Sequence, residues 1–319
     1  MNRESLRDYS IKQDAPYGGC NHHLQLDPVA VIGGEAGTIA RFALQSLHQE
    51  LAAFPKPGLV SPVDSGSHRD MDAALFYRSL FSLRHYFSDI AAAGMRGAEF
   101  AELKQLGIAA EQRMMQATSG VNTHRGAIFN LGLLAAAAGS LKAEDRQLKA
   151  DAIAGRVRSF WGDAIRAHGA VLPKTSHGGL VANRHGVGGA LQEAACGFPH
   201  VFKVGLPALL ECHARGVDQN RAAVQCLFFL MSRLADTNLL YRGGETGLRF
   251  VHRVSNEFIA DGGVFQPDWK DRAMALHRQF VEKNLSPGGS ADLLAATLFV
   301  GRLLQRYGGC RTGLKDGTL

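Results

Sequence analysis

A chain of 319 residues with 46% hydrophobic and 20% charged residues is long enough to bury a substantial core, which excludes a largely disordered protein. The net charge of +6 suits polyanionic ligands, but Lys and Arg are spread along the chain, which argues against a nucleic-acid-binding tail or a polybasic membrane patch. Five scattered cysteines, the lack of an apolar signal segment after Met1 and the shortness of the apolar runs predict a cytoplasmic protein that binds neither nucleic acid nor membrane.

The chain begins with an arm and not with a nucleotide-binding motif. Residues 1–28 lack periodicity, so we expect a loosely ordered arm, in which Cys20, His22 and His23 are too few ligands for a metal site. Residues 29–37 look like a strand with a dinucleotide-binding loop, but a GxGxxG frame ending at Gly37 would need glycine in place of Ile32. A dinucleotide-binding fold is therefore not predicted.

Apolar residues recur at helical spacing along most of the remaining chain. No stretch shows sustained period-two alternation, so we predict an all-α fold of about ten helices in one domain spanning residues 29–307, followed by a flexible tail at 308–319. The predicted helices are 36–53, 70–93, 99–117, 127–139, 145–168, 201–214, 219–234, 244–260, 267–283 and 291–307, with a short helix at 190–196.

The polar and glycine-rich clusters fall at the junctions between predicted helices. In a helical bundle such junctions can meet at one end and line a single cleft, where the N–H groups of helix starts bind phosphates and Lys56, Arg125 and Arg242 supply charge. Residues 118–129 fit such an anion pocket, and they equally fit an ordinary capped turn. The junctions lie around Lys56 and in residues 68–70, 120–126, 186–193, 236–244 and 286–292.

Three carboxylates at these junctions indicate a metal site. Asp70, Asp236 and Asp292 would repel one another without a cation, and a shared Mg²⁺ resolves this; the alternative is that each caps its own helix. Capping is favoured for Asp292, and metal binding for Asp236, to which Asn238 adds an oxygen. Because GxSxG, Walker and HExxH motifs are absent, the residues alone indicate a helical enzyme that uses Mg²⁺ to act on an anionic, phosphorylated substrate.

Several of these segments together resemble the motifs of triphosphoribosyl-dephospho-coenzyme A synthases. The matches occur in family order, over residues 55–60, 67–71, 120–129, 236–244 and 285–294. The family makes the precursor of the prosthetic group of malonate decarboxylase or citrate lyase, and residues 176–199 look more like the malonate decarboxylase branch. The chain departs from the family pattern at Leu191, where the family usually has Arg. This difference would weaken phosphate binding or indicate a different acceptor.

The resemblance implies that the 2′-hydroxyl of 3′-dephospho-coenzyme A attacks the anomeric carbon of the ribose of ATP, that adenine leaves, and that the product passes to a transferase acting on an acyl carrier protein. It does not decide whether the protein is a monomer or a homo-oligomer. With Mg²⁺ at Asp236, Asp70 and Asp292, we expect Glu193 or Asp70 as base and His124 or His68 as acid, although each His also fits a hydrogen-bonded helix cap. Expected substrate contacts come from Lys56, Asn122, Thr123, Arg125, Asn238, Arg242, Ser286, Gly288, Gly289 and Ser290.

Two other functions remain open from the sequence. A nucleoside-phosphate glycohydrolase would use water as the acceptor and would release adenine without dephospho-coenzyme A. A non-catalytic module for binding the nucleotide or the carrier protein would follow if Leu191 has disabled the site, and it would bind without turnover.

Overall fold

The computed structural model describes residues 34–171 and 187–308, which contain helices and no strand. The predicted all-α class is confirmed, and the predicted arm at 1–28 and the tail from residue 309 lie outside the described residues. Before residue 172 the helices are α1 (Glu35–Ala52), α2 (Ala73–Ser82), α3 (Tyr86–Met95), α4 (Phe100–Ala117), α5 (Arg125–Ala143) and α6 (Ala150–Val171). After residue 186 they are α8 (Gly189–Ala195), the π-helix η1 (Val201–Gly205), α9 (Leu206–Ala214), α10 (Gln219–Met231), α11 (Thr237–Ala260), the 3-10 helix η2 (Gly263–Phe265), α12 (Trp269–Glu282) and α13 (Gly288–Tyr307).

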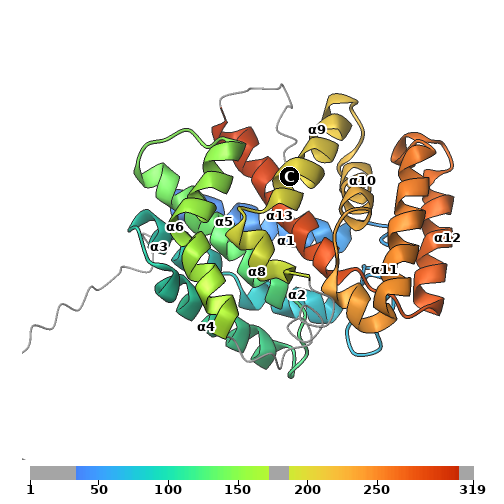
Figure 1. Cartoon of the computed structure of the whole chain (residues 1–319), viewed down its shortest axis with the longest axis horizontal. Coiled ribbons are helices and arrows are strands. Elements are labelled where there is room, and N and C mark those ends of the chain that lie inside the picture. Colours follow the sequence, from blue (N-terminus) through green and yellow to red (C-terminus); the bar gives the residue numbers. More distant parts are fainter. Residues whose placement is uncertain (1–33, 172–186, 309–319) are drawn as a thin grey trace, which may run out of the picture.

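Helix α5 lies at the centre of the core because its sequence is apolar on nearly every side. Helices α1, α3, α6 and α13 pack around it (Figure 1). Among the described helices it is the one long and apolar enough to cross a bilayer, but most of it is buried inside the protein, as in the core helix of a soluble protein. Burial of this helix fixes the position of its first residues, which belong to the candidate site.

Small residues bring α3 and α5 into close contact. A β-carbon at Gly94 would overlap the backbone of Ala136, and one at Gly139 would overlap the carbonyl of Ala91. The two backbones therefore touch where the side chains are absent, and larger residues at these glycines would force the helices apart. This contact holds α5 firmly from one side.

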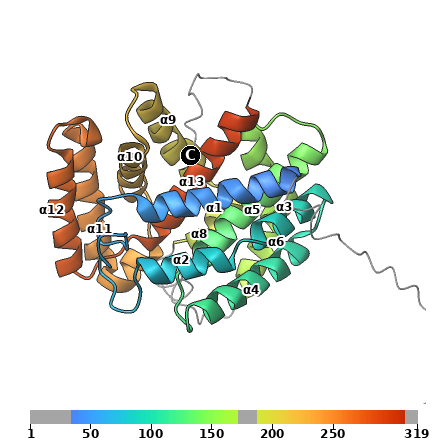
Figure 2. The same cartoon turned by 180° about the vertical axis from the view of Figure 1, so that it is seen from behind.

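Helix α13 runs diagonally through the middle of the molecule, and its first residues lie beside the first residues of α11 (Figure 1). Seen from behind, α1 crosses this face with α2 alongside it (Figure 2). The loop of residues 53–72 connects α1 to α2, and the Ser67 hydroxyl ties it to the segment before α13 through the Leu285 carbonyl at 2.7 Å. The starts of α11 and α13 thus meet this loop at one end of the bundle.

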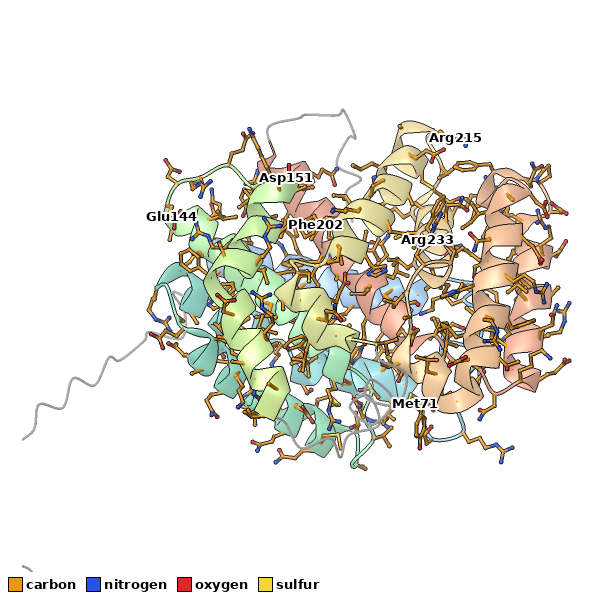
Figure 3. All side chains as sticks on the ribbon, viewed as in Figure 1. Met71, Glu144, Asp151, Phe202, Arg215 and Arg233 are labelled. Carbon is orange, nitrogen blue, oxygen red and sulfur yellow. The ribbon has the colours of Figure 1, made fainter. Side chains whose placement is uncertain are left out.

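Ion pairs at the periphery join consecutive helices. Arg156 of α6 is buried and donates two hydrogen bonds of 2.6 Å to the two carboxylate oxygens of Glu144, which follows α5. Glu144, Asp151 and Arg215 are labelled at the edge of the molecule in Figure 3, where charged side chains reach solvent. The interior between the helices is filled by apolar side chains.

Three of the differences between the predicted and observed helix boundaries bear on the site. Residues 70–93 form two helices, α2 and α3, separated at residues 83–85, and the cap of α2 is Asp72, whose carboxylate accepts from the Leu75 N–H at 2.8 Å. Residues 237–243, predicted as a loop, form the first turns of α11, and Gly244 interrupts that helix with a φ of 59°. Helix α13 begins at Gly288, three residues before the predicted start, so its glycines belong to its first turn.

Candidate active site

The candidate site forms where the starts of α5, α11 and α13 come together. Gly126 in the first turn of α5 faces Asp292 in the first turns of α13, and a β-carbon at Gly126 would overlap the Asp292 carboxylate. Gly289 of α13 faces Asp236, the N-cap of α11, and Gly288 faces Asn238 in the same way. Three of the predicted glycine-rich junctions therefore do gather at one place, and the glycines are what allow the helix starts to approach.

The protein's own carboxylates already occupy the anion positions at these helix starts. Asp236 accepts from the Asn238 N–H at 2.9 Å, and its other oxygen accepts from the Ser290 N–H at 2.8 Å and the Ser290 hydroxyl at 3.0 Å. Asp292 accepts from the backbone N–H of Ala127 in α5. Asp236 is therefore the cap of its own helix, as the alternative prediction had it, whereas Asp292 lies inside α13 and faces a different helix.

The carboxylates of Glu50, Asp236 and Asp292 lie close enough for Asp292 to be repelled by the other two. Burial, together with the negative charges of Glu50 and Asp236, raises the pKa of Asp292 well above its usual value. Burial also raises the pKa of Asp236, although its hydrogen bonds oppose the shift. The one cation in direct contact with these acids in the described part of the chain is Lys56, whose Nζ lies 2.6 Å from Glu50 Oε1. A further cation at Asp236 and Asp292 would relieve the repulsion.

The predicted set of three metal-binding carboxylates is not formed. Within the described residues, no group of three or more His, Cys, Asp or Glu side chains is placed to hold a metal ion. Asp70 is exposed and lies 3.8 Å from His68 Nδ1. Two protein carboxylates completed by substrate phosphates and water are nevertheless a common arrangement for Mg²⁺, so the donor set of Asp236 and Asp292 fits this ion.

Lys56 is buried and not exposed to a bound ligand. Its ammonium donates to the Glu50 carboxylate and, at 2.5 Å, to the Glu50 carbonyl, and burial lowers its pKa. Its positive charge reaches His124, because it contributes, after burial, to lowering the pKa of that histidine. A direct contact between Lys56 and a phosphate stays a prediction.

His124 is the N-cap residue of α5, and in the described part of the chain one of its ring nitrogens is hydrogen-bonded and the other has no partner. Thr123 donates to the Ser79 hydroxyl at 2.7 Å, and the Ser79 hydroxyl lies 2.5 Å from His124 Nδ1. The bond from Thr123 leaves the Ser79 proton free to be donated to Nδ1, and in that arrangement the ring proton lies on Nε2. His124 Nε2 is buried and has no hydrogen-bond partner within residues 34–171 and 187–308. Burial lowers the pKa of His124 to about 3, so the ring is neutral at pH 7.

The turn before α5 ties down the helix start, and its predicted role as an anion pocket stays a prediction. Asn122 accepts from the Arg125 N–H at 3.1 Å, which is the geometry of a capped helix start. Arg125 itself is half exposed and its side chain pairs with Glu111, with Nε 2.6 Å from Oε1. Contacts of Asn122, Thr123 and Arg125 with a substrate stay predictions.

A second cluster lies next to the first, around the loop between α1 and α2. Arg242 of α11 donates to the Ser67 carbonyl at 2.8 Å and to His68 Nδ1 at 3.1 Å. His68 Nε2 then donates to the Ser286 hydroxyl at 2.8 Å. Burial and the charge of Arg242 lower the pKa of His68 to about 4, so this ring is also neutral at pH 7. Arg242 and His68 therefore hold the loop against α11 and the segment before α13.

Glu193 and Leu191 face other parts of the protein. Glu193 of α8 accepts from the His200 N–H at 2.7 Å and lies 2.8 Å from His200 Nδ1, which raises the pKa of His200. Leu191 packs on the core against Gly169 of α6. Within the described residues, neither side chain is bonded to the group around Asp292, and the role of Glu193 as a base stays a prediction. Residues 172–186, which include part of the branch-specific segment, lie outside the described residues.

Two residues of the site were missed in the sequence. Glu50 lies on the apolar face of α1, buried next to Leu47 and Leu51, and an acid on a hydrophobic stripe is a signal that could have revealed it. Ser79 is fully buried inside α2, where a serine in a helix gives no pattern that distinguishes it from any other small residue.

Comparisons with known proteins agree with this picture. The sequence model of the CitG family, described as ATP:dephospho-CoA triphosphoribosyl transferase, matches residues 36–311. A probable 2-(5''-triphosphoribosyl)-3'-dephosphocoenzyme-A synthase of Acinetobacter calcoaceticus is 43% identical over 278 residues, covering 87% of this chain and 94% of that protein. A protein of Pectobacterium atrosepticum named 2-(5''-triphosphoribosyl)-3'-dephosphocoenzyme-A synthase is 38% identical, covering 79% of this chain and 84% of its own length. No solved structure matches the chain.

Proposed function

The chain belongs to the family of ATP:dephospho-CoA triphosphoribosyl transferases, and we propose that it carries out this transfer where α5, α11 and α13 begin. The enzyme is a transferase that joins the triphosphoribosyl group of ATP to 3′-dephospho-CoA. A bond forms between the acceptor 2′-oxygen and C1′ of the ATP ribose, and the bond from C1′ to adenine breaks. The acceptor hydroxyl loses one proton, and adenine leaves with one proton.

The observation that carries this assignment is the pair Asp236 and Asp292 at three converging helix starts. The triphosphate is a polyanion, yet the helix starts already face carboxylates, so phosphates bind here only when a cation lies between. Asp236 and Asp292 would hold Mg²⁺, which would neutralise the triphosphate and relieve their mutual repulsion. Their carboxylates also suit the positive charge that develops on the ribose as adenine departs.

We propose that His124 acts as a neutral hydrogen-bond donor and not as an imidazolium acid. Its pKa of about 3 leaves it uncharged, and donation from the Ser79 hydroxyl to Nδ1 would place the ring proton on Nε2, which has no partner among the described residues. A substrate acceptor atom would satisfy this buried N–H. His68, neutral for a similar reason, positions the loop that carries Asp70, and Asp70 remains our candidate base together with Glu193.

The route of the product is a further proposal. The sequence from residue 176 to 199 favours the malonate decarboxylase branch over citrate lyase, and the product would pass to a transferase that loads an acyl carrier protein. A cytoplasmic location is supported by the free thiols of Cys196, Cys212 and Cys226, which suit a reducing compartment.

One experiment separates the transferase from its alternatives. Purified protein is incubated with ATP and Mg²⁺, with and without dephospho-CoA, and adenine is followed by liquid chromatography. We expect adenine only when the acceptor is present, together with a product that contains both substrates minus adenine. Equal adenine release without acceptor would indicate the glycohydrolase, and binding of ATP without any adenine release would indicate a binding module.

A further inference from the structure

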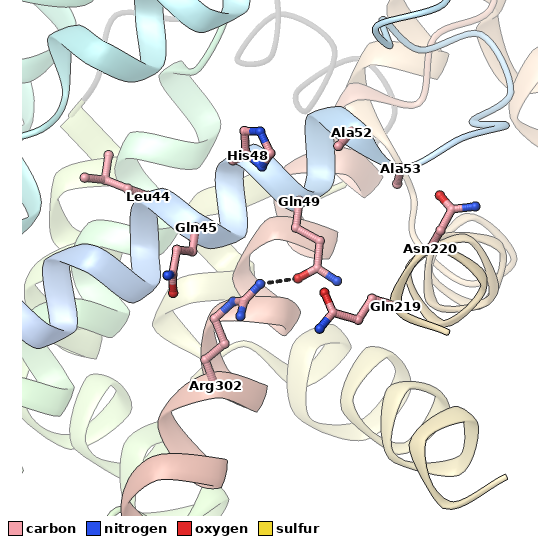
Figure 4. Close-up of a pocket in the computed structure, with 9 residues that line it drawn as sticks. All are labelled: Leu44, Gln45, His48, Gln49, Ala52, Ala53, Gln219, Asn220 and Arg302. Atoms are coloured by element: carbon pink, nitrogen blue, oxygen red, sulfur yellow. Dashed lines mark hydrogen bonds between the residues drawn. The ribbon is translucent and has the colours of Figure 1, made fainter. Parts of the chain in front are cut away.

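A groove away from the candidate active site lies between α1, α10 and α13 (Figure 4). Its volume is about 520 Å³. Four carboxamides line it, those of Gln45, Gln49, Gln219 and Asn220, and the one charged side chain among its lining residues is the guanidinium of Arg302. Arg302 lies fourteen residues after the first residue of α13, which corresponds to roughly 20 Å along the helix from the starts described above.

The Arg302 guanidinium has no counterion within the described residues. It donates to the Gln49 side-chain oxygen, and its Nε is buried with no hydrogen-bond partner among the residues that the structure describes. Burial lowers the pKa of Arg302 with no carboxylate to oppose the shift, and its charge also lowers the pKa of His213 nearby. A partly buried cation without an anion costs stability, and a bound anion would offset that cost.

The remaining walls of the groove favour the same kind of ligand. Gln219 is the first residue of α10, so the start of this helix lies at the groove, where the Asp218 carboxylate caps it by accepting from the Arg221 N–H at 2.9 Å. Asn220 is fixed by two hydrogen bonds to the backbone of Phe54, at 2.8 and 2.7 Å, and forms a rigid wall. Gln45 is exposed and has a carboxamide that both donates and accepts.

We propose that this groove binds a phosphate ester that also carries amide groups, with Arg302 holding the phosphate and the carboxamides of Gln45 and Gln219 pairing with the amides. Free 4′-phosphopantetheine has this chemistry. The arm of dephospho-CoA has it as well, but its phosphates adjoin the ribose whose 2′-hydroxyl reacts, so an acceptor that reacts at the candidate active site does not place them in a groove roughly 20 Å away. This exclusion of the reacting acceptor rests on the proposed function, whereas the binding site itself does not. The apolar side chains of Leu44, Ala52 and Ala53 contact the aliphatic part of such a ligand.

Direct binding tests the groove independently of catalysis. Isothermal titration of the full chain uses 4′-phosphopantetheine and inorganic phosphate as probes. Arg302→Gln is expected to weaken binding of 4′-phosphopantetheine at least about tenfold, as expected for a lost charge-assisted hydrogen bond. Gln45→Glu, at an exposed position, places a negative charge at the groove and is also expected to weaken binding of 4′-phosphopantetheine. Arg306→Gln, an exposed position on the same helix outside the groove, is the matched control and is expected to bind as the unaltered protein does.

Kinetics distinguish the two sources of the ligand. If the groove holds the arm of the acceptor, Arg302→Gln raises KM for dephospho-CoA and leaves KM for ATP unchanged. If it holds a free phosphate ester, both KM values stay unchanged while binding of the probe is lost. The proposal is overturned if 4′-phosphopantetheine does not bind, or if the folded Arg302→Gln and Gln45→Glu variants bind it as tightly as Arg306→Gln. A protein that releases no adenine would contradict the proposed function and leave these binding results standing.

Discussion

Replacement of Gly126 by alanine tests the contact between α5 and α13 that forms the site. A β-carbon at residue 126 would overlap the Asp292 carboxylate, so this side chain must leave the start of α5 and lose the Ala127 N–H. Losing a hydrogen bond to a charged group costs about 1.5–3 kcal/mol, while exchange of glycine for alanine in a helix returns about 1 kcal/mol. We expect Gly126→Ala to be less stable by about 0.5–2 kcal/mol and to lose most of its adenine-releasing activity.

A matched control isolates this contact from helix propensity. Gly155 lies in α6, and a β-carbon there would meet nothing within 4 Å, so Gly155→Ala is expected to be more stable by about 0.5–1 kcal/mol with unchanged activity. Urea unfolding gives the two stabilities, and adenine release with both substrates gives the two rates. If Gly126→Ala matched Gly155→Ala in both stability and rate, the reasoning about Asp292 would be refuted.

Three further predictions concern the proton and metal chemistry. Ser79→Ala removes the donor to His124 Nδ1 and is expected to lower kcat on the order of tenfold and stability by about 1–3 kcal/mol, because Thr123 and His124 each lose a partner. Ser82→Ala on the same helix is expected to leave kcat unchanged, and equal rates for the two folded variants would rule out the fixed tautomer. His68 has a pKa of about 4 when folded and 6.5 as its ordinary value, so its contribution to stability, about 3 kcal/mol, is complete above pH 6.5 and is lost as the pH falls towards 4. Urea unfolding at pH 7 and pH 5 measures how far the free energy of unfolding falls between these two pH values. We expect a smaller fall in His68→Gln than in the unaltered protein, and an identical fall would exclude this residue as the cause. Removal of divalent cations with EDTA is expected to stop adenine release, and Asp292→Asn to raise the Mg²⁺ concentration for half-maximal rate at least about tenfold, whereas activity in EDTA would exclude the metal.

The helices were predictable where glycine or proline marks their ends and hidden where such residues are absent. The prolines at Pro55 and Pro57 correctly ended the first helix. Residues 83–85 contain neither residue type, so the break between α2 and α3 left no mark in the pattern. Residues 236–244 carry Asp, Asn and Gly, which favour turns, yet Asp236 caps a helix there because Ser290 of α13 also anchors its carboxylate.

The site was predictable as a set of junctions but not as a set of contacts. The spacing of motifs gave the segments around Gly126, Asp236 and Gly288, which do meet. It could not reveal that Lys56 is buried against Glu50, because burial of a cation depends on how the loop after α1 folds back on that helix. Nor could it separate Asp70 from the other two aspartates, since that depends on tertiary packing.

The most direct test of the account is a crystal structure of the full chain with ATP and Mg²⁺. The account predicts the triphosphate at the starts of α5, α11 and α13, with the cation between its oxygens and the carboxylates of Asp236 and Asp292. It also predicts a substrate atom within hydrogen-bonding distance of His124 Nε2. ATP bound elsewhere, with Asp236 and Asp292 in contact only with protein, would contradict the central claim.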